Sequence, residues 1–144
     1  MVNQRKYALE LLTYAGLLAC KPALTLIENH KKLSSFGSVP FTYIQVYRRL
    51  IERLMYLTNT RPDITFFVQQ LSWFLAKPTI VHYATTIRIL KYIKGAPSLG
   101  LFFSFNTSAN LKAFFIVIGA SAVIQDNQMT DFSVYLENSL TSWK

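Results

Sequence analysis

One proline inside an otherwise helical stretch, Pro62, most constrains the fold, because it divides residues 47–78 into two amphipathic helices. Proline has no backbone N–H, so the first position of a helix tolerates it well, and the following Asp63 suits the positive end of the helix dipole. Residues 58–61 interrupt the apolar pattern just before it. The stretch therefore predicts a helical hairpin whose turn lies at residues 58–61.

Two apolar stripes supply the hairpin with buried faces, because apolar residues spaced three or four apart lie on one side of a helix. The first stripe consists of Val46, Tyr47, Leu50, Ile51, Leu54, Met55 and Leu57. The second consists of Ile64, Phe67, Val68, Leu71 and Leu75. The second helix is expected to end at Lys77, because the residue before Pro78 is pushed out of helical geometry.

Two further helices are predicted on either side of the hairpin. Asn3 can cap a helix over residues 4–15, which Gly16 is suited to end. Its buried stripe is Ala8, Leu11, Leu12 and Ala15. An extended stretch over residues 17–27 and a polar linker over residues 28–42 follow. The fourth helix covers residues 79–94, and its inward residues are Tyr83, Ile87, Leu90 and Ile93.

The pattern changes after Gly95, where short alternating or apolar runs separated by turns indicate strands at residues 99–105, 111–118 and 131–137, with another beginning at 140. We therefore expect an α+β fold, with about four helices followed by a short antiparallel β-meander. The expected organisation is 1–41 for the first helix, extended segment and linker, 42–97 for the hairpin and basic helix, and 98–144 for the strands.

The charge balance limits the partners. The net charge of +8 arises from 15 basic and 7 acidic residues, which favours a polyanion such as nucleic acid, or an anionic membrane surface. An acidic neighbouring segment of a longer chain is an equally open explanation. A lone Cys20 excludes an internal disulfide framework and indicates a reducing, intracellular environment. The longest apolar run, residues 113–124, is well short of the ~20 residues that span a bilayer.

Catalytic chemistry is not favoured. Two-metal sites need several carboxylates converging on ions ~3.5–4 Å apart, whereas the seven acids are scattered. They are Glu10, Glu28, Glu52, Asp63, Asp126, Asp131 and Glu137. His30 and His82 have no partner at ligand spacing, Cys20 has no second cysteine, and no glycine-rich phosphate loop is present. We therefore expect no metal ligands and no cofactor.

Basic side chains remain as candidates for nucleic-acid binding. Cations spaced three or four apart share one exposed helix face, which contact with phosphates requires. The candidates are Arg48, Arg49 and Arg53 on the first helix of the hairpin and Arg88, Lys91 and Lys94 on the fourth helix. A solvated helix face that keeps the protein soluble explains the same pattern.

The motifs along residues 47–95 resemble the copia-type retrotransposon Pol polyprotein. That family reads Y-R-x-L-x-G-x-L-x-Y-L, then T-R-P-D-I, then a helix ending in K-P and another ending in Y-L-K-G-T. The matching residues are Tyr47, Arg48, Leu50, Leu54, Tyr56, Leu57, Thr60, Arg61, Pro62, Asp63, Ile64, Lys77, Pro78, Tyr92, Lys94 and Gly95. Residues 4–22 and 138–144 extend the likeness over nearly the whole chain, although Glu52 replaces a family glycine.

The resemblance implies a thumb-like or connection-like region that follows the reverse transcriptase palm and runs into truncated ribonuclease H-like strands. The polymerase motif Y-V-D-D is absent, and the nuclease aspartates fall on Ile116 and Ile118. Isoleucine offers no oxygen to Mg²⁺, the metal of the parent family. The glycine before the family's second nuclease strand likewise reads Asp131. The implied protein is a fragment without enzymatic activity of its own.

The implied partners are the missing palm and fingers of the parent polyprotein and, through weak charge-driven contacts, nucleic acid. An alternative of a different class is a non-functional remnant or a recruited protein-interaction module. An open sheet edge beside the uncharged apolar run at residues 113–118 would then mediate self-association.

Overall fold

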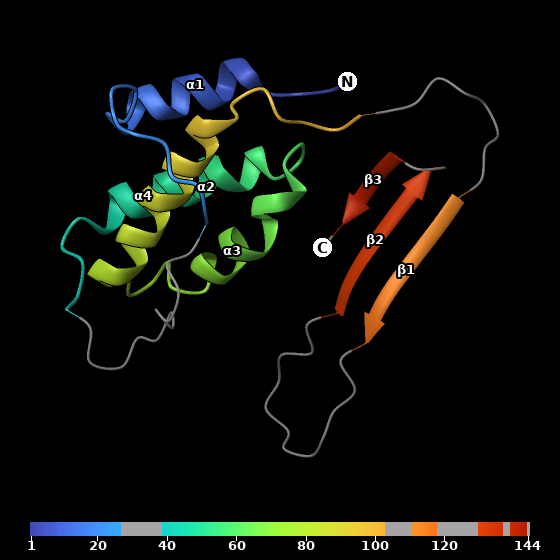
Figure 1. Cartoon of the computed structure of the whole chain (residues 1–144). Helices are drawn as coiled ribbons and strands as arrows, with labels where there is room; N and C mark the ends of the chain where they lie inside the picture. The colour runs from blue at the N-terminus through green and yellow to red at the C-terminus, as the bar shows by residue number, and fades with distance from the viewer. Residues whose placement is uncertain (27–38, 103–110, 118–129, 137–138, 144) are drawn as a thin grey trace. The chain divides into compact units, whose positions relative to one another are not determined.

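The computed structural model describes residues 1–26, 39–102, 111–117, 130–136 and 139–143 (Figure 1). It divides into two compact units. One is Asn3–Gly100, and the other joins Met1–Val2 to Leu101–Lys144. All four helices lie in the first unit and the three strands in the second. In the described residues the chain is thus mostly helical, which is compatible with the predicted α+β class.

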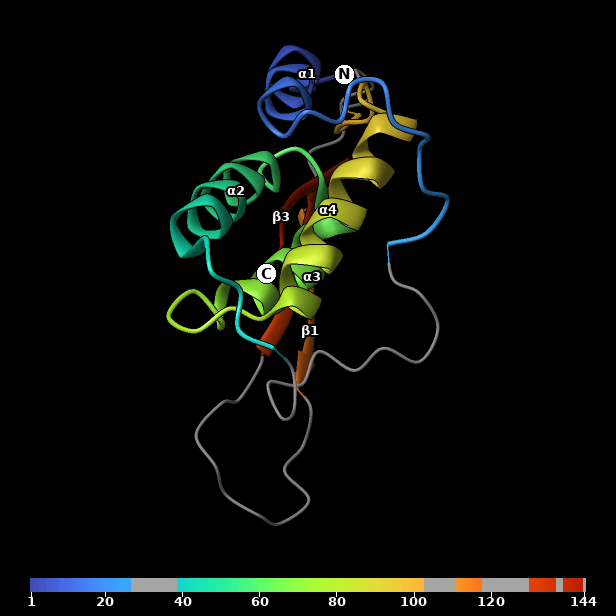
Figure 2. The same cartoon turned by 90° about the vertical axis from the view of Figure 1, so that its left-hand side faces the viewer.

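Four helices build the larger unit around one core. They are α1 (Arg5–Tyr14), α2 (Ile44–Leu57), α3 (Pro62–Ser72) and α4 (Ile80–Gly95). Helices α2 and α3 form the predicted hairpin, and each of them also packs against α4, while α1 packs against α2 and α4. Figure 2 shows α4 running between α2 and the segment 17–26, which we call the strap.

The core confirms most of the predicted stripes. Its buried members are Ala8, Leu11, Leu12, Tyr47, Leu50, Ile51, Leu54, Leu57, Ile64, Val68, Leu71, Ile89, Leu90 and Ile93. Phe67, Leu75, Tyr83 and Ile87 are half-buried against this set. Val46 and Met55, which were assigned to the buried face of α2, are instead 39% and 48% exposed. They lie at the edges of the apolar face of α2, so the predicted buried stripe included too many residues.

Helix α3 ends at Ser72 rather than at the predicted Lys77. Two side chains from α2 bond carbonyls near this end. The Tyr47 hydroxyl donates to the Leu71 carbonyl at 2.7 Å, and the Arg48 Nε donates to the Leu75 carbonyl at 2.9 Å. The backbone around them tightens into turns, in which Phe74 N–H donates to Leu71 at 3.1 Å. Hydrogen bonds from α2 side chains therefore replace the last helical turn. The helix ends several residues before the position at which Pro78 would have ended it.

Helix α1 begins one residue later and ends one residue earlier than predicted, and Gly16 terminates it as predicted. Its N-cap is Gln4, without a side-chain cap, and Asn3 accepts instead from the Arg5 N–H at 3.4 Å. At its end Gly16 has a φ of 68°, a left-handed conformation that favours glycine. The N–H groups of Gly16 and Leu17 donate back to Thr13 and Leu12, which is the Schellman arrangement.

The smaller unit contains an antiparallel sheet with strand order β1 (Leu111–Val117), β2 (Thr130–Leu136), β3 (Ser139–Trp143). Ile116 of β1 pairs with Asp131 of β2, and the register shifts between Val134 and Tyr135. The strand expected at 99–105 is represented by an isolated bridge between Val2 and Leu101. Residues 103–105 of that strand, residues 28–38 of the linker with His30, and Ile118 and Asp126 all lie outside the described residues.

Candidate functional site

The predicted cations on α2 point toward different neighbours. Arg48 is tied through its Nε to the Leu75 carbonyl after α3. Arg53 leans toward α1, where its guanidinium carbon lies 4.2 Å from the centroid of the Tyr14 ring. Arg49 is exposed. The three arginines therefore do not form one continuous charged face, although Arg49 and Arg53 lie one helical turn apart.

The predicted cations on α4 meet the strap. Arg88 donates to Thr25 twice, from Nε to the carbonyl at 3.1 Å and from Nη2 to the hydroxyl at 2.8 Å. The Lys94 ammonium donates to the Cys20 carbonyl, and the Ala23 N–H donates to the Lys91 carbonyl at 3.1 Å. Strap oxygens thus accept from two donors of Arg88 and one of Lys94, whereas Lys91 meets the strap through its backbone carbonyl.

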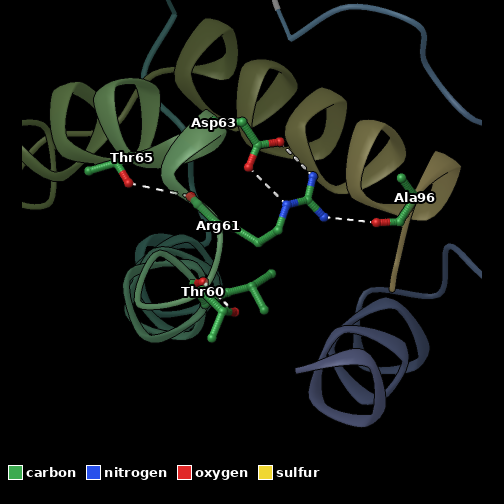
Figure 3. Close-up of polar contacts among 6 residues, drawn as sticks. Thr60, Arg61, Asp63, Thr65 and Ala96 are labelled. Atoms are coloured by element: carbon green, nitrogen blue, oxygen red, sulfur yellow. Dashed lines mark hydrogen bonds and ion pairs between the residues drawn. The ribbon is translucent and has the colours of Figure 1, made fainter. Parts of the chain in front are cut away.

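A basic side chain that was not proposed as a site residue, Arg61, lies at the centre of the hairpin turn (Figure 3). It is 1% exposed, and its Nε and Nη2 donate to the two carboxylate oxygens of Asp63 at 2.8 and 2.7 Å. Its Nη1 donates to the Ala96 carbonyl at 2.9 Å. This fork joins the start of α3 to the chain just past α4. The Thr60 hydroxyl similarly donates to the Gln4 side chain at 3.1 Å, which brings α1 to the same turn.

Three tyrosines and one arginine lie between α1 and α2 as two contacting pairs, Tyr7 with Tyr56 and Arg53 with Tyr14, which we together call the Tyr–Arg ladder. The rings of Tyr7 and Tyr56 meet edge to face, with centroids 5.0 Å apart at 66°. Burial raises the pKa of Tyr7, while the nearby charge of Arg53 lowers it. Arg53 and Tyr56 are three residues apart on α2, so the two pairs are neighbours on one helix face. Tyr14 and Tyr56 are 42% and 54% exposed.

His82 is a buried helix-capping residue and does not extend the basic face of α4. Its Nδ1 accepts from the Thr79 N–H at 3.1 Å, and its own N–H donates to the Thr79 hydroxyl, forming a capping box. Its ring stacks on Phe74 with centroids 3.9 Å apart. Burial lowers the pKa of His82. Because Nδ1 is the acceptor, the neutral ring carries its proton on Nε2, which has no partner among the described residues.

The described residues hold no group of three or more His, Cys, Asp or Glu side chains that could bind a metal ion. Ile116, one of the two positions implied for nuclease aspartates, lies on β1, and Ile118 lies outside the described residues. Cys20 is half-buried, and its thiol donates to the Leu17 carbonyl. No helix in the described ranges has the length and apolar character needed to cross a membrane.

Comparison with known proteins identifies relatives of this chain. The chain is 32% identical over 142 residues to the retrovirus-related Pol polyprotein from transposon RE1 of Arabidopsis thaliana, an alignment that covers 99% of the chain. The Pol polyprotein from transposon RE2 of the same plant is 30% identical over 142 residues, again 99% of the chain. The homologues of this chain are retrovirus-related transposon Pol polyproteins. No protein-family model and no solved structure matches.

The chain spans only part of these Pol relatives. It covers 10% of each polyprotein, and 59% of the uncharacterized mitochondrial protein AtMg00810 of Arabidopsis thaliana, to which it is 32% identical over 142 residues.

The sequence Thr60-Arg61-Pro62-Asp63 contributes the Arg61 fork, a role that its position after α2 did not reveal. The spacing Thr79-x-x-His82 does follow the capping-box pattern, with histidine in place of glutamate.

Proposed function

We propose that this chain is the part of a copia-type retrotransposon Pol polyprotein that follows the reverse transcriptase palm and enters a ribonuclease H-like domain. The observation that carries the proposal is the alignment with the RE1 Pol polyprotein over 99% of the chain. The order of the motifs supports the finer placement, since T-R-P-D-I at residue 60 precedes K-P at residue 77 and Y-I-K-G at residue 92.

The contacts of Thr60, Arg61, Pro62 and Asp63 favour a structural role over a catalytic one. Pro62 opens α3, and Asp63 lies in its first turn and receives both donors of the Arg61 fork. These residues hold three helices in register around the turn. A polymerase could therefore need these residues to hold its helices together, without any of them contacting the substrate.

A chimera tests the placement. Residues 3–100 would replace the aligned segment of the RE1 Pol polyprotein, and extension of a primer on an RNA template would be measured. We expect extension well above that of an otherwise identical polyprotein with the segment deleted. Extension no better than the deletion, from a chimera that is produced in soluble form, would contradict the proposal.

The proposed fragment has no catalytic activity alone. Three antiparallel strands in sequential order support a ribonuclease H-like beginning, but Ile116 and Ile118 replace the implied aspartates. Neither side chain can ligate Mg²⁺. The chain incubated with an RNA–DNA duplex and Mg²⁺ is expected to leave the RNA intact. Metal-dependent cleavage by a preparation free of contaminating nuclease would refute this part.

Weak nucleic-acid binding is the remaining proposed activity, through Arg48, Arg49, Arg53, Arg88, Lys91 and Lys94. The net charge of +8 and the exposure of Arg49 support it. Binding that depends on phosphate contacts releases counterions, so affinity should fall steeply with salt. Filter binding at low and high salt decides the matter, since no retention at low salt, or retention indifferent to salt, is incompatible with phosphate contacts.

Self-association through the sheet is a second candidate, favoured by the position of β1. Within the described residues β1 pairs only with β2, and its sequence LKAFFIV contains a single charge. An edge of this kind can pair with a second copy. Size-exclusion chromatography across a range of protein concentrations tests it, and a concentration-independent monomer would rule it out.

A further inference from the structure

The strongest unexplained surface is the Tyr–Arg ladder between α1 and α2. Its chemistry differs from that of a simple basic patch, because three aromatic rings and one guanidinium lie together on two neighbouring helices. Tyr14 and Tyr56 expose 42% and 54% of their surfaces although both belong to the best-packed unit of the chain. The Arg53 guanidinium lies over the Tyr14 ring, so a planar cation is already held in a stacked position.

We infer that the Tyr–Arg ladder binds unpaired nucleotides by stacking their bases, an inference that rests on the proposed nucleic-acid function and names the form of nucleic acid that this surface takes. Aromatic rings and arginine planes accept any base face, and this mode of binding is typical of single strands. Paired bases in a duplex are stacked on one another, so their faces are not accessible to these rings. The ladder therefore adds discrimination for single strands to the charge-driven binding.

The dimensions and charges fit a short run of nucleotides. Tyr7 and Tyr14 are seven residues apart on α1, about 10 Å along the helix, which equals about three base rises of a stacked strand. Arg49, one turn before Arg53 and exposed, is available for phosphate. Glu10 raises the pKa of Tyr7 and so places a negative charge near that ring. We accordingly assign base stacking to the two exposed rings, Tyr14 and Tyr56, which belong to different pairs of the ladder.

Paired variants separate stacking from charge and from folding. Fluorescence anisotropy would measure binding of the full chain to a labelled single strand of about 12 nucleotides, as DNA and as RNA, and to an RNA–DNA duplex of the same length. Tyr14→Leu combined with Tyr56→Leu should weaken single-strand binding by about fivefold or more. Duplex binding should change by less than about twofold, and the salt dependence should stay the same because no charge is removed.

Two controls keep the inference falsifiable. Tyr14→Phe combined with Tyr56→Phe preserves the rings and should preserve single-strand affinity. Tyr43→Leu removes a tyrosine that is 69% exposed but lies outside the ladder, and should have no effect. Far-UV circular dichroism should be the same for every variant, and for a leucine pair that fails to fold, each single leucine variant is measured in its place.

The outcomes distinguish this inference from the proposed function. If binding depends on salt but the leucine variants bind single strands as tightly as the original chain, only the inference about the Tyr–Arg ladder is refuted. Equal losses for single strand and duplex overturn it as well. Absence of salt-dependent binding to every probe overturns the ladder together with the nucleic-acid part of the proposed function.

Discussion

Removing the charge of Asp63 should destabilise the helical unit more than removing Arg61, although both changes break the same ion pair. The Arg61 side chain is 2% exposed and that of Asp63 is 26% exposed. Asp63→Asn leaves a guanidinium buried without an opposite charge, whereas Arg61→Met leaves a carboxylate that water can reach. The partner that remains therefore decides the cost.

The expected loss of unfolding free energy depends on which interactions each variant removes. Breaking a buried pair by removing one partner costs about 3–5 kcal/mol, and Asp63→Asn falls in this range. It also removes a charge at the start of α3 that contributes about 0.3–1 kcal/mol. Arg61→Met loses three hydrogen bonds but leaves Asp63 partly hydrated, and the exposed Ala96 carbonyl can bond water. Its expected cost is about 1–3 kcal/mol.

Urea unfolding followed by circular dichroism at a helix-sensitive wavelength measures these differences. The double variant Arg61→Met with Asp63→Asn should cost about as much as Arg61→Met alone, because the stranded charge is then gone. Glu52→Gln and Arg49→Met, both at exposed positions of α2, control for the loss of one charge of either sign. A larger cost for Arg61→Met than for Asp63→Asn, or additive costs in the double variant, would refute the reasoning.

Three further predictions concern single positions. His82 has a lowered pKa because of burial, so below its ordinary value of about 6.5 the unfolded chain binds more protons than the folded one; stability should fall as pH drops from 7 to 5, by at most about 1.4 kcal/mol per pH unit, and His82→Gln should flatten this trend in thermal melts. Tyr47→Phe loses the 2.7 Å bond to the Leu71 carbonyl and should cost about 1 kcal/mol by urea unfolding, whereas Tyr43→Phe at an exposed position should not; equal stability of the Tyr47 variant would show the bond to be unimportant. Gly16→Ala should cost about 1 kcal/mol because φ is 68°, with no steric contribution, whereas Gly95→Ala meets only ordinary contacts and should be tolerated; the reverse order of melting temperatures would contradict the assignment.

Local pattern was enough to place the helices because periodicity and stop signals agree along this chain. Pro62 opens α3 and Gly16 ends α1 as expected, since both act through their own backbone. The end of α3 could not be derived in the same way. It depends on the Tyr47 hydroxyl and the Arg48 guanidinium, which arrive from 24 and 27 residues earlier in the chain.

The candidate site shows the same division between local and distant causes. Helical spacing identified which cations share a helix, but it carried no information on what faces them. Arg88 and Lys94 meet the strap, and Arg53 meets Tyr14 from another helix. A buried arginine such as Arg61 is equally invisible, because a charged residue in a turn is normally assumed to be solvated.

The strap would couple the proposed phosphate binding to local unfolding. A phosphate that takes the Nε and Nη2 donors of Arg88, or the Lys94 proton that bonds the strap, would first displace Thr25 or Cys20. Apparent affinity on this side of α4 would then be reduced by the fraction of molecules in which the strap is open. By reciprocity, polyanions should speed hydrogen exchange at the Ala23 amide, which bonds the Lys91 carbonyl in the closed state.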